Sequence, residues 1–474
     1  MLSLNASFSK DIILLFLTLT LMNHFGCTPD VKPGHLQIHP LPADIPQSRL
    51  YHLMVDDQPV PVEQLTSKLP IDSLPDWFTS EPYTQVQQEV HVADFSADGA
   101  ISIQIELSSP VESVKIRPQS RNIRADVEEQ VVTFTMQAPD KLYIEIDSLP
   151  ELCLFANPLE DQLPMQESDS LIYFGPGIHH PGYIQLQSGK DIYLAAGAYV
   201  YGGIRGDRVS DVKIFGRGVL DGDYRFSDMV YIGNCENIQV TGITIRNGRG
   251  WTNSLFNCDQ MKYDGVKVIS FGPSGDGINP LGSRNFEITD CFLRCTDDCI
   301  AIKSPDSTLS IHDIVVSDNT MIGYAFSDGI TIGFETNGPE IKNIEVRNCD
   351  ILMSRGGSRV DGHSAFSVIC DGPADIYDIF YENIRVEVPM RKLFELQITA
   401  GDLYGIDPPG KIKNIHLKNI EWSSPNPIVL KGYDQNHQVE HITFENCTIN
   451  GQKLLEPSPD IFQMGEYVQG VYFK

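Results

Sequence analysis

Between residues 190 and 450 the chain consists of short runs in which apolar and polar positions alternate. The segments VTGITI (240–245) and VRNCDIL (346–352) are examples. Alternation with a period of two is typical of β-strands, whereas the spacing of three and four residues that marks an amphipathic helix is nearly absent here. The pattern predicts an all-β chain of short strands joined by turns of Gly, Asn or Asp.

A polar residue followed by an apolar strand recurs along this region, with successive copies starting 20 to 36 residues apart. The copies start at Asp211, Asn237, Asn285, Asp313, Asn343, Asp378, Asn414 and His441, with weaker ones near Asp191 and Gln260. One turn of strands per ~25 residues, repeated about ten times, predicts a right-handed parallel β-helix, because stacked coils bury apolar faces that a single coil leaves open. A leucine-rich solenoid would need Leu at fixed spacings, and a propeller would need about 40 to 45 residues per unit.

Asn and Cys recur at equivalent places in these copies. The Asn residues predict either an internal ladder of stacked amides or turns in the left-handed conformation, which Asn tolerates. Nine cysteines remain besides Cys27, and no Cys-x-x-Cys pair occurs, which disfavours a zinc ribbon. Their recurrence in the repeat predicts buried thiols rather than the disulfides that are usual in exported proteins. We expect neither a metal ion nor a cofactor.

The N-terminal third has a different pattern. Alternating runs at 101–107, 114–117, 131–137 and 142–147 are joined by polar turns and predict a small antiparallel β-sandwich. The stretch before them is rich in Pro and polar residues, and we expect it to be extended or wrapped on the sandwich. The predicted parts are a signal peptide (1–26), a Pro-rich polar segment (27–85), the β-sandwich (86–165) and a catalytic β-helix domain (166–474).

The first residues resemble an export signal. Residues 12–22, IILLFLTLTLM, form an apolar run that is too short to span a bilayer but fits the core of a secretory signal, and Lys10 precedes it. Gly26 and Cys27 after this run resemble a bacterial lipoprotein cleavage site, at which Cys27 would be acylated and anchored to a membrane. An ordinary secretory signal is the alternative. We therefore expect an exported protein, either a periplasmic or outer-membrane lipoprotein or a secreted one.

The charge of the chain narrows its partners. The 474 residues include 35 Lys and Arg against 63 Asp and Glu, a formal net charge of −28, with 41% hydrophobic residues. This is the composition of a globular protein. The excess of carboxylates argues against binding nucleic acid, whose phosphates it would repel. It also disfavours a strongly anionic polymer as substrate.

Three aspartates fall one coil apart in the middle of the repeat. Asp276 lies in SGDGIN (274–279), and Asp297 and Asp298 follow 21 and 22 residues later. Stacked coils of a parallel sheet lie about 4.8 Å apart, so these carboxylates become neighbours on one face. Crowded like charges raise at least one pKa, which leaves a protonated acid beside an ionised one, as glycoside hydrolysis requires. Solvated turn acids are the alternative interpretation.

At these residues the chain resembles the polygalacturonases of glycoside hydrolase family 28, over roughly 170–390. The motifs that carry the resemblance are IFGRGVLDG (214–222), WTNSLFNC (251–258), DDCIAIKS (297–304) and Asp276, in the place of the aspartate of the family's Asn-Thr-Asp. The resemblance implies that Asp297 is the general acid and that Asp276 and Asp298 activate water, with inversion at the anomeric carbon. Strict strand alternation would point Asp297 and Asp298 to opposite faces, so a bulge or turn is expected there.

Two departures from the family separate this chain from a plain pectinase. Asp328 stands where the family has the His of Gly-His-Gly, and the Arg-Ile-Lys that grips galacturonate has no counterpart around 365–370. A sandwich ahead of the β-helix and a three-aspartate site without that His also resemble family 49, the dextranases and isopullulanases. That family attacks neutral α-glucans, which the negative charge of this chain suits better.

Several other residues are candidates for substrate binding, and Asp328, in the place of the family's His, is one of them. Lys303 and Glu335 end two neighbouring predicted strands and either line the cleft or form an exposed pair. Trp251 either stacks on a sugar ring or packs at a coil edge. The turn at 354–365 could supply the missing cationic grip through Arg355, Arg359 and His363. A solvated loop is the alternative.

Three functions remain open on the sequence. The leading one is an exported, inverting hydrolase of a polysaccharide or oligosaccharide, either polygalacturonase-like or directed at neutral α-glucans. The second is a Ca²⁺-dependent lyase or epimerase with Lys303 as its base. The third is a rod that binds glycans without turnover. The sugar, the linkage, endo or exo action and the oligomeric state are left open.

Overall fold

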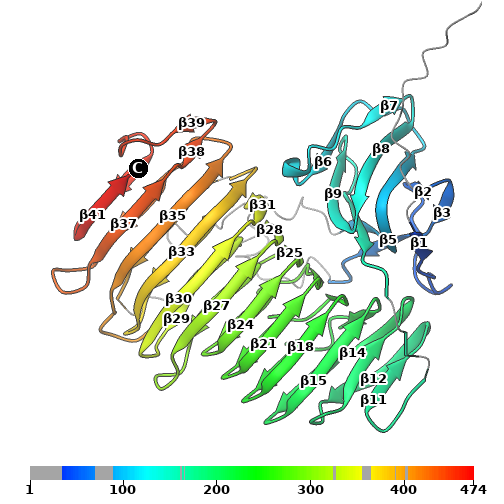
Figure 1. Cartoon of the computed structure of the whole chain (residues 1–474), viewed down its shortest axis with the longest axis horizontal. Helices are drawn as coiled ribbons and strands as arrows, with labels where there is room; N and C mark the ends of the chain where they lie inside the picture. The colour runs from blue at the N-terminus through cyan, green and yellow to red at the C-terminus, as the bar shows by residue number, and fades with distance from the viewer. Residues whose placement is uncertain are drawn as a thin grey trace, which may run out of the picture. The chain divides into compact units, whose positions relative to one another are not determined.

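The computed structural model describes residues 35–69, 89–160, 163–164, 166–323, 327–354, 364–389, 391–400 and 404–474. In these residues every regular element is a β-strand except one short 3₁₀ helix, η3 (Gln119–Arg121). The strands form a 10-stranded sheet near the N-terminus and a 31-stranded sheet that takes up the rest of the chain (Figure 1). The structure confirms the predicted all-β class.

The 10-stranded sheet is organised around one long strand, β5 (Glu89–Glu106). Its first half pairs with β1, β4 and β10, and its second half pairs with β2 and β8. All pairings in this sheet are antiparallel except that of β5 with β10. The remaining strands are β1 (His35–Ile38), β2 (His52–Val55), β3 (Gln58–Val60), β4 (Val62–Thr66), β6 (Val114–Arg117), β7 (Asp126–Glu128), β8 (Val131–Ala138), β9 (Asp140–Ile146) and β10 (Leu152–Asn157).

The predicted runs at 101–107, 114–117, 131–137 and 142–147 coincide with β5, β6, β8 and β9. The Pro-rich segment differs from the expectation, because it supplies β1 to β4. Leu53, Val55 and Val60 on these strands are buried in the same core as Phe95 and Leu154. Burial of these apolar side chains makes the segment part of the sheet rather than a wrapping.

The 31-stranded sheet is a parallel β-helix, in which each strand pairs with its counterparts one coil away. The first ladder of stacked strands is β11 (Leu171–Phe174), β13 (Asp191–Leu194), β15 (Ser210–Gly216), β18 (Glu236–Thr241), β21 (Asp259–Asp264), β24 (Arg284–Thr289), β27 (Ile311–Ser317), β30 (Glu340–Arg347), β33 (Asp375–Val386), β35 (Ile412–Trp422), β37 (Val439–Glu445) and β41 (Val468–Phe473). The second is β16 (Val219–Asp221), β19 (Thr244–Arg246), β22 (Lys267–Ile269), β25 (Phe292–Cys295), β28 (Thr320–Gly323) and β31 (Asp350–Ser354), continued by the ends of β33 and β35 and by β38 (Thr448–Ile449), which β39 (Gln452–Lys453) joins.

The third ladder carries the candidate site. It consists of β17 (Val230–Gly233), β20 (Asn253–Phe256), β23 (Ile278–Leu281), β26 (Ile300–Ser304), β29 (Ile330–Thr336), β32 (Phe366–Cys370), β34 (Phe394–Ile398), β36 (Ile428–Lys431) and β40 (Phe462–Met464). At the N-terminal end, β12 (Gly177–Gln185) and β14 (Ala198–Asp207) are long enough to serve both the second and the third ladder.

The sequence repeat maps directly onto the first ladder. The polar residue that opens each copy, from Asp211 to His441, has a left-handed φ of 50 to 59°. The apolar residue after it is buried, as Ile238, Phe286 and Ile344 are. Side-chain bonds also join coils, since the Asn237 amide donates to Asp211 at 2.7 Å and that of Asn414 to Asp378 at 3.0 Å. The left-handed turns are therefore confirmed, whereas the bonds cited here lie at the surface and run from Asn to Asp, unlike the predicted internal ladder of stacked amides.

The cysteines are free and buried, as predicted. All nine cysteines in the described part of the chain are single thiols, and burial raises their pKa wherever a shift is resolved, for example to about 12 for Cys258 and Cys291. They serve as small apolar side chains in the core.

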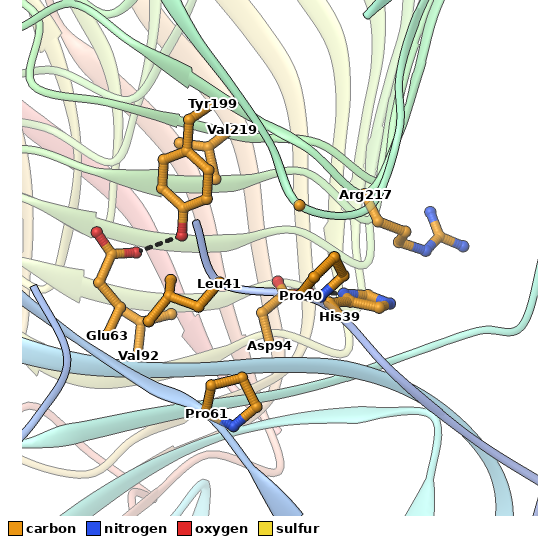
Figure 2. Close-up of a pocket in the computed structure, with 11 residues that line it drawn as sticks. His39, Pro40, Leu41, Pro61, Glu63, Val92, Asp94, Tyr199, Arg217 and Val219 are labelled. Carbon is orange, nitrogen blue, oxygen red and sulfur yellow. Dashed lines mark hydrogen bonds and ion pairs between the residues drawn. The ribbon is translucent and has the colours of Figure 1, made fainter. Parts of the chain in front are cut away.

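Strand β4 of the sandwich meets the β-helix through a buried ionic cluster. The Arg246 guanidinium donates to both oxygens of Glu63, at 2.7 and 2.9 Å, and to Asp221 at 2.7 Å. The Tyr199 hydroxyl also donates to Glu63, at 2.9 Å (Figure 2). The cavity beside this contact has a volume of about 40 Å³. That volume suits a few water molecules rather than a sugar.

Candidate active site

Four aspartates lie at the same corner of successive coils, where the second ladder turns into the third. Asp276 comes just before β23, Asp297 and Asp298 just before β26, and Asp328 just before β29. The three strands are in register, with Ile278 opposite Ile300 and Ile300 opposite Ile330. The predicted one-coil spacing of Asp276 and the Asp297–Asp298 pair is therefore present in the structure.

Close packing of coils holds this corner in place. A Cβ on Gly277 would lie 2.3 Å from the carbonyl oxygen of Cys299, so only Gly fits beside Asp276. Within the corner, the Asp298 N–H donates to Asp297 Oδ1 at 3.1 Å. Asp297 and Asp298 lie in a turn between strands rather than within one, so strand alternation does not separate them.

Lys303 and Glu335 join the aspartates. Lys303 Nζ lies 3.6 Å from Asp276 Oδ2 and 3.3 Å from Glu335 Oε2. The same ammonium lies 4.2 Å from the centre of the Trp251 ring. The structure thus brings these three predicted residues together with Asp276, and Lys303 is a shared cation among several carboxylates.

A bulge on β29 aims Glu335 at Lys303. Ile302 pairs with Ile332 but Ser304 pairs with Thr336, so the single residue Lys303 lies opposite 333–335. Glu335 itself has a φ of 50°, in the left-handed region that non-Gly residues rarely adopt. Bulges of this kind redirect side chains next to functional sites.

The carboxyl groups at this corner hold protons strongly. Burial, and next the charge of Asp298, raise the pKa of Asp297 to about 8. Burial and the charge of Asp276 raise the pKa of Asp298 to about 8. Burial and the charge of Asp297 raise the pKa of Asp276 well above its usual value, against the opposing charge of Lys303. The group can therefore hold both a protonated and an ionised carboxyl near neutral pH.

Asp328 is fully buried and its oxygens accept hydrogen bonds from the chain that follows. The Ser364 N–H donates to Asp328 Oδ1 at 2.8 Å, and the Ser367 hydroxyl donates to Oδ2. The Asp328 N–H in turn donates to Asp298 Oδ1 at 2.9 Å. Asp328 therefore ties Asp298 to the next coil, and its role in substrate binding stays a prediction.

The sequence did not single out Ser364, Ser367 or Asn279. Asn279 on β23 has no exposed surface, and neither atom of its side-chain amide has a hydrogen-bond partner among the described residues. Asp276 Oδ1 also has no hydrogen-bond partner among them. A polar residue within the short apolar run that follows Asp276 was the available signal for Asn279.

The remaining predictions concern four residues outside the described part of the chain, metal binding and membrane anchoring. Cys27, Arg355, Arg359 and His363 lie outside the described residues. Among the residues that the structure describes, no group of three or more His, Cys, Asp or Glu is arranged to hold a metal ion. No helix within that part of the chain has the length and apolarity to cross a membrane.

These observations define a parallel β-helix protein with a buried carboxylate cluster at mid-length. The model of glycosyl hydrolases family 28 matches residues 184–458. This match covers more than half of the sequence, and the chain belongs to that family.

Known proteins with similar sequence or structure agree with this assignment. An exopolygalacturonase of Zea mays is 26% identical over 197 residues, which make up 40% of this chain and 46% of the relative. The chain spans about half the length of the curated relatives it matches.

Solved structures show the same architecture at lower identity. Dex49A from Penicillium minioluteum matches with a TM-score of 0.62 at 14% identity, over 92% of this chain and 96% of its own. The polygalacturonase from Erwinia carotovora ssp. carotovora matches with a TM-score of 0.50 at 15% identity, over 64% of this chain and 87% of its own. These likenesses concern the fold. The coverage of Dex49A includes the sandwich as well as the β-helix, in line with the layout predicted from the sequence.

Proposed function

We propose that this protein is an exported, inverting glycoside hydrolase of a polysaccharide or oligosaccharide, with Asp297 as general acid and Asp276 and Asp298 as the groups that activate water. Membership of a glycosyl hydrolase family supports the class of reaction. The single observation that carries the assignment of residues is the group of three proton-holding carboxyls on two adjacent coils.

The chemistry follows from the unequal surroundings of these groups. Asp297 is the most exposed of the three, and its pKa of about 8 keeps it protonated at neutral pH, so it donates its proton to the glycosidic oxygen. Asp276 lies nearest to the Lys303 cation, which favours its ionised form. The ionised carboxylate takes a proton from the water that attacks the anomeric carbon, and the product has inverted configuration.

The surrounding residues take supporting roles in this proposal. Lys303 limits how far the carboxyl pKa values rise, and Glu335 holds Lys303 in place. Trp251 covers Lys303 and offers a ring surface at the edge of the site. Asp328 positions Asp298 through its backbone N–H rather than contacting substrate.

A lyase or epimerase mechanism fits this site less well. Such a reaction needs a base for the C5 proton, and Lys303 was the candidate. The carboxylates of Asp276 and Glu335 raise the pKa of Lys303 above its ordinary value despite burial. Lys303 therefore stays protonated and is a poor base.

The test compares two aspartate-to-asparagine variants on a panel of polygalacturonate, partly esterified pectin, dextran and pullulan. We expect Asp297→Asn to lower the release of reducing ends by about 10² to 10⁴-fold. Asp318→Asn is the matched control, because Asp318 lies in an exposed turn on the next coil and has a left-handed φ of 59° that Asn tolerates. Unchanged turnover in Asp297→Asn would overturn the proposal, and the anomer of the first product, read by NMR, tests inversion.

A further inference from the structure

Arg205 on β14 has a guanidinium that backbone carbonyls hold in one orientation. Its Nη1 donates to the carbonyl oxygens of Ile204, at 2.8 Å, and Asp228, at 2.6 Å, and its Nη2 donates to that of Ser227 at 2.7 Å. A guanidinium has five N–H donors, so the Nε–H and one Nη2–H remain without a partner among the described residues. No carboxylate is paired with Arg205 in that part of the chain.

In a guanidinium the Nε–H and the nearer Nη2–H share one edge of the planar group. This edge matches the two oxygens of a carboxylate, and an Arg held beforehand in the right orientation loses little freedom on binding one. In a protein with a net charge of −28, a fixed cation without an ion-pair partner points to an anionic ligand.

Two exposed aromatic rings flank this cation. The guanidinium carbon lies 4.1 Å from the centre of the Tyr183 ring and 6.0 Å from that of Tyr231. The two tyrosines are 44% and 42% exposed, and Phe226 packs edge-on against Tyr183 at 4.9 Å. Rings with an apolar face and a polar tip, next to Arg, are the side chains most often found at binding surfaces. The C–H face of a sugar ring suits such a surface.

The register of the third ladder connects this surface to the candidate active site. Arg205 pairs with Tyr231, Tyr231 with Ser254, and Ser254 with Asn279. Asn279 lies on β23, one coil before the strand that follows Asp297 and Asp298. At about 4.8 Å per coil, four steps place Arg205 about 19 Å from that strand, toward the N-terminus.

We propose that Arg205, Tyr183 and Tyr231 form a distal subsite that binds a uronic-acid residue of the polysaccharide, several sugars away from the bond that is cleaved. The glycan lies along the β-helix axis, its carboxylate bound by Arg205 and its sugar rings packed against Tyr183 and Tyr231. This inference rests on the proposed function, in that the ligand is the substrate glycan. In this proposal Arg205 is the cation that binds the sugar carboxylate, in place of the Arg-Ile-Lys that the sequence lacks around 365–370.

The test is a binding cycle with hexagalacturonide and its methyl ester, measured by calorimetry in the Asp297→Asn background so that no turnover occurs. Charged hydrogen bonds of this kind are typically worth about tenfold to hundredfold in affinity. We expect Arg205→Gln to lose that factor for the acid and much less for the ester, and Arg205→Lys to lose an intermediate factor because it keeps the charge but not the fork. Arg208→Gln is the matched control, because Arg208 is an exposed Arg in the turn directly after β14.

Tyr231→Ala should weaken both the acid and the ester, because it removes the ring surface rather than the charge. Thermal unfolding of each variant confirms that the fold is kept. Equal affinity of the parent protein and Arg205→Gln for the acid would overturn the inference. So would an equal loss for acid and ester in Arg205→Gln, or no binding of hexagalacturonide by the parent. The proposed function fails on a different measurement, the turnover of Asp297→Asn, so the two failures are distinguishable.

Discussion

Two of the buried ionic clusters in the described part of the chain balance their charges differently. At the contact between sandwich and β-helix, Arg246 is bonded to two carboxylates through three short hydrogen bonds. At the candidate active site, Lys303 is the one cation among the described residues that is paired with Asp276 and Glu335, and Asp297 and Asp298 are close enough to affect its pKa. In the first cluster both carboxylates accept short hydrogen bonds from Arg246. In the second cluster the carboxyl groups outnumber the cation.

The pKa directions follow from this difference. Burial alone would raise the pKa of Asp94, near the contact, but Lys267 and His39 outweigh it, and the pKa is lowered. Burial also raises the pKa of Asp297, and there the neighbouring Asp298 adds to the effect. The charge beside a buried acid therefore decides whether its pKa is lowered, as in a structural ion pair, or raised, as in a catalytic group.

The largest effect should come from breaking the balanced cluster. Arg246→Met leaves Glu63 and Asp221 buried without their cation, and we expect the free energy of unfolding to fall by about 3–5 kcal/mol. Denaturant unfolding measures it. Arg208→Met, which removes an exposed ion pair, should cost less than about 1 kcal/mol. Equal stability of these two variants would contradict the distinction between the clusters.

The next effect should come from removing the cation of the unbalanced cluster. Lys303 lowers the pKa of Asp276, Asp297 and Asp298, so Lys303→Met raises these values further. The acidic limb of the pH–activity profile should move to higher pH, with turnover at pH 5 reduced by about tenfold to hundredfold. Lys262→Met, a more exposed Lys on β21, should leave the profile in place. An unmoved profile in Lys303→Met would remove Lys303 from the mechanism.

A smaller effect concerns stability against pH. The pKa of Asp297 is raised from 3.8 to about 8, so the folded state holds its proton more tightly than the unfolded state does. The free energy of unfolding therefore falls as pH rises from about 4 to about 8. Asp297→Asn should be more stable than the parent by about 1–2 kcal/mol at pH 8 and equal to it near pH 4. Thermal unfolding at both pH values measures the gap, and a gap that widens toward pH 4 would have the wrong sign.

The smallest effect should come from the exposed turns, where no charge is buried. Asn237→Ala removes the bond to Asp211 and places Ala at a φ of 54°, at an expected cost of about 1–2 kcal/mol. Asn237→Gly removes the bond but tolerates the turn, so it should cost less. Denaturant unfolding of both variants separates the contributions. Equal losses in the two variants would show that the lost side-chain bond, not the left-handed turn, accounts for the cost.

Much of the fold and the core of the candidate site could be predicted from the sequence, because a coil repeats its own local chemistry. A polar residue in the left-handed turn and a buried apolar residue after it recur at each coil, as at Asn285 and Phe286, and mark the first ladder. Once the coil length is known, the stacking of Asp276 on the Asp297–Asp298 pair follows. The family resemblance rested on the same short motifs.

Features that depend on contacts between distant segments were decided only by the tertiary structure. The bulge that brings Glu335 to Lys303 breaks the repeat, and no local pattern indicates which way the extra residues point. Asp328 accepts hydrogen bonds from Ser364 and Ser367, which lie 36 and 39 residues further along the chain. The sequence pattern of β1 to β4 predicted a polar segment instead of strands, because their partner, β5, is distant in the sequence. A periodic sequence determines the stacking of its coils, whereas the direction of a side chain between coils depends on partners that only the folded chain supplies.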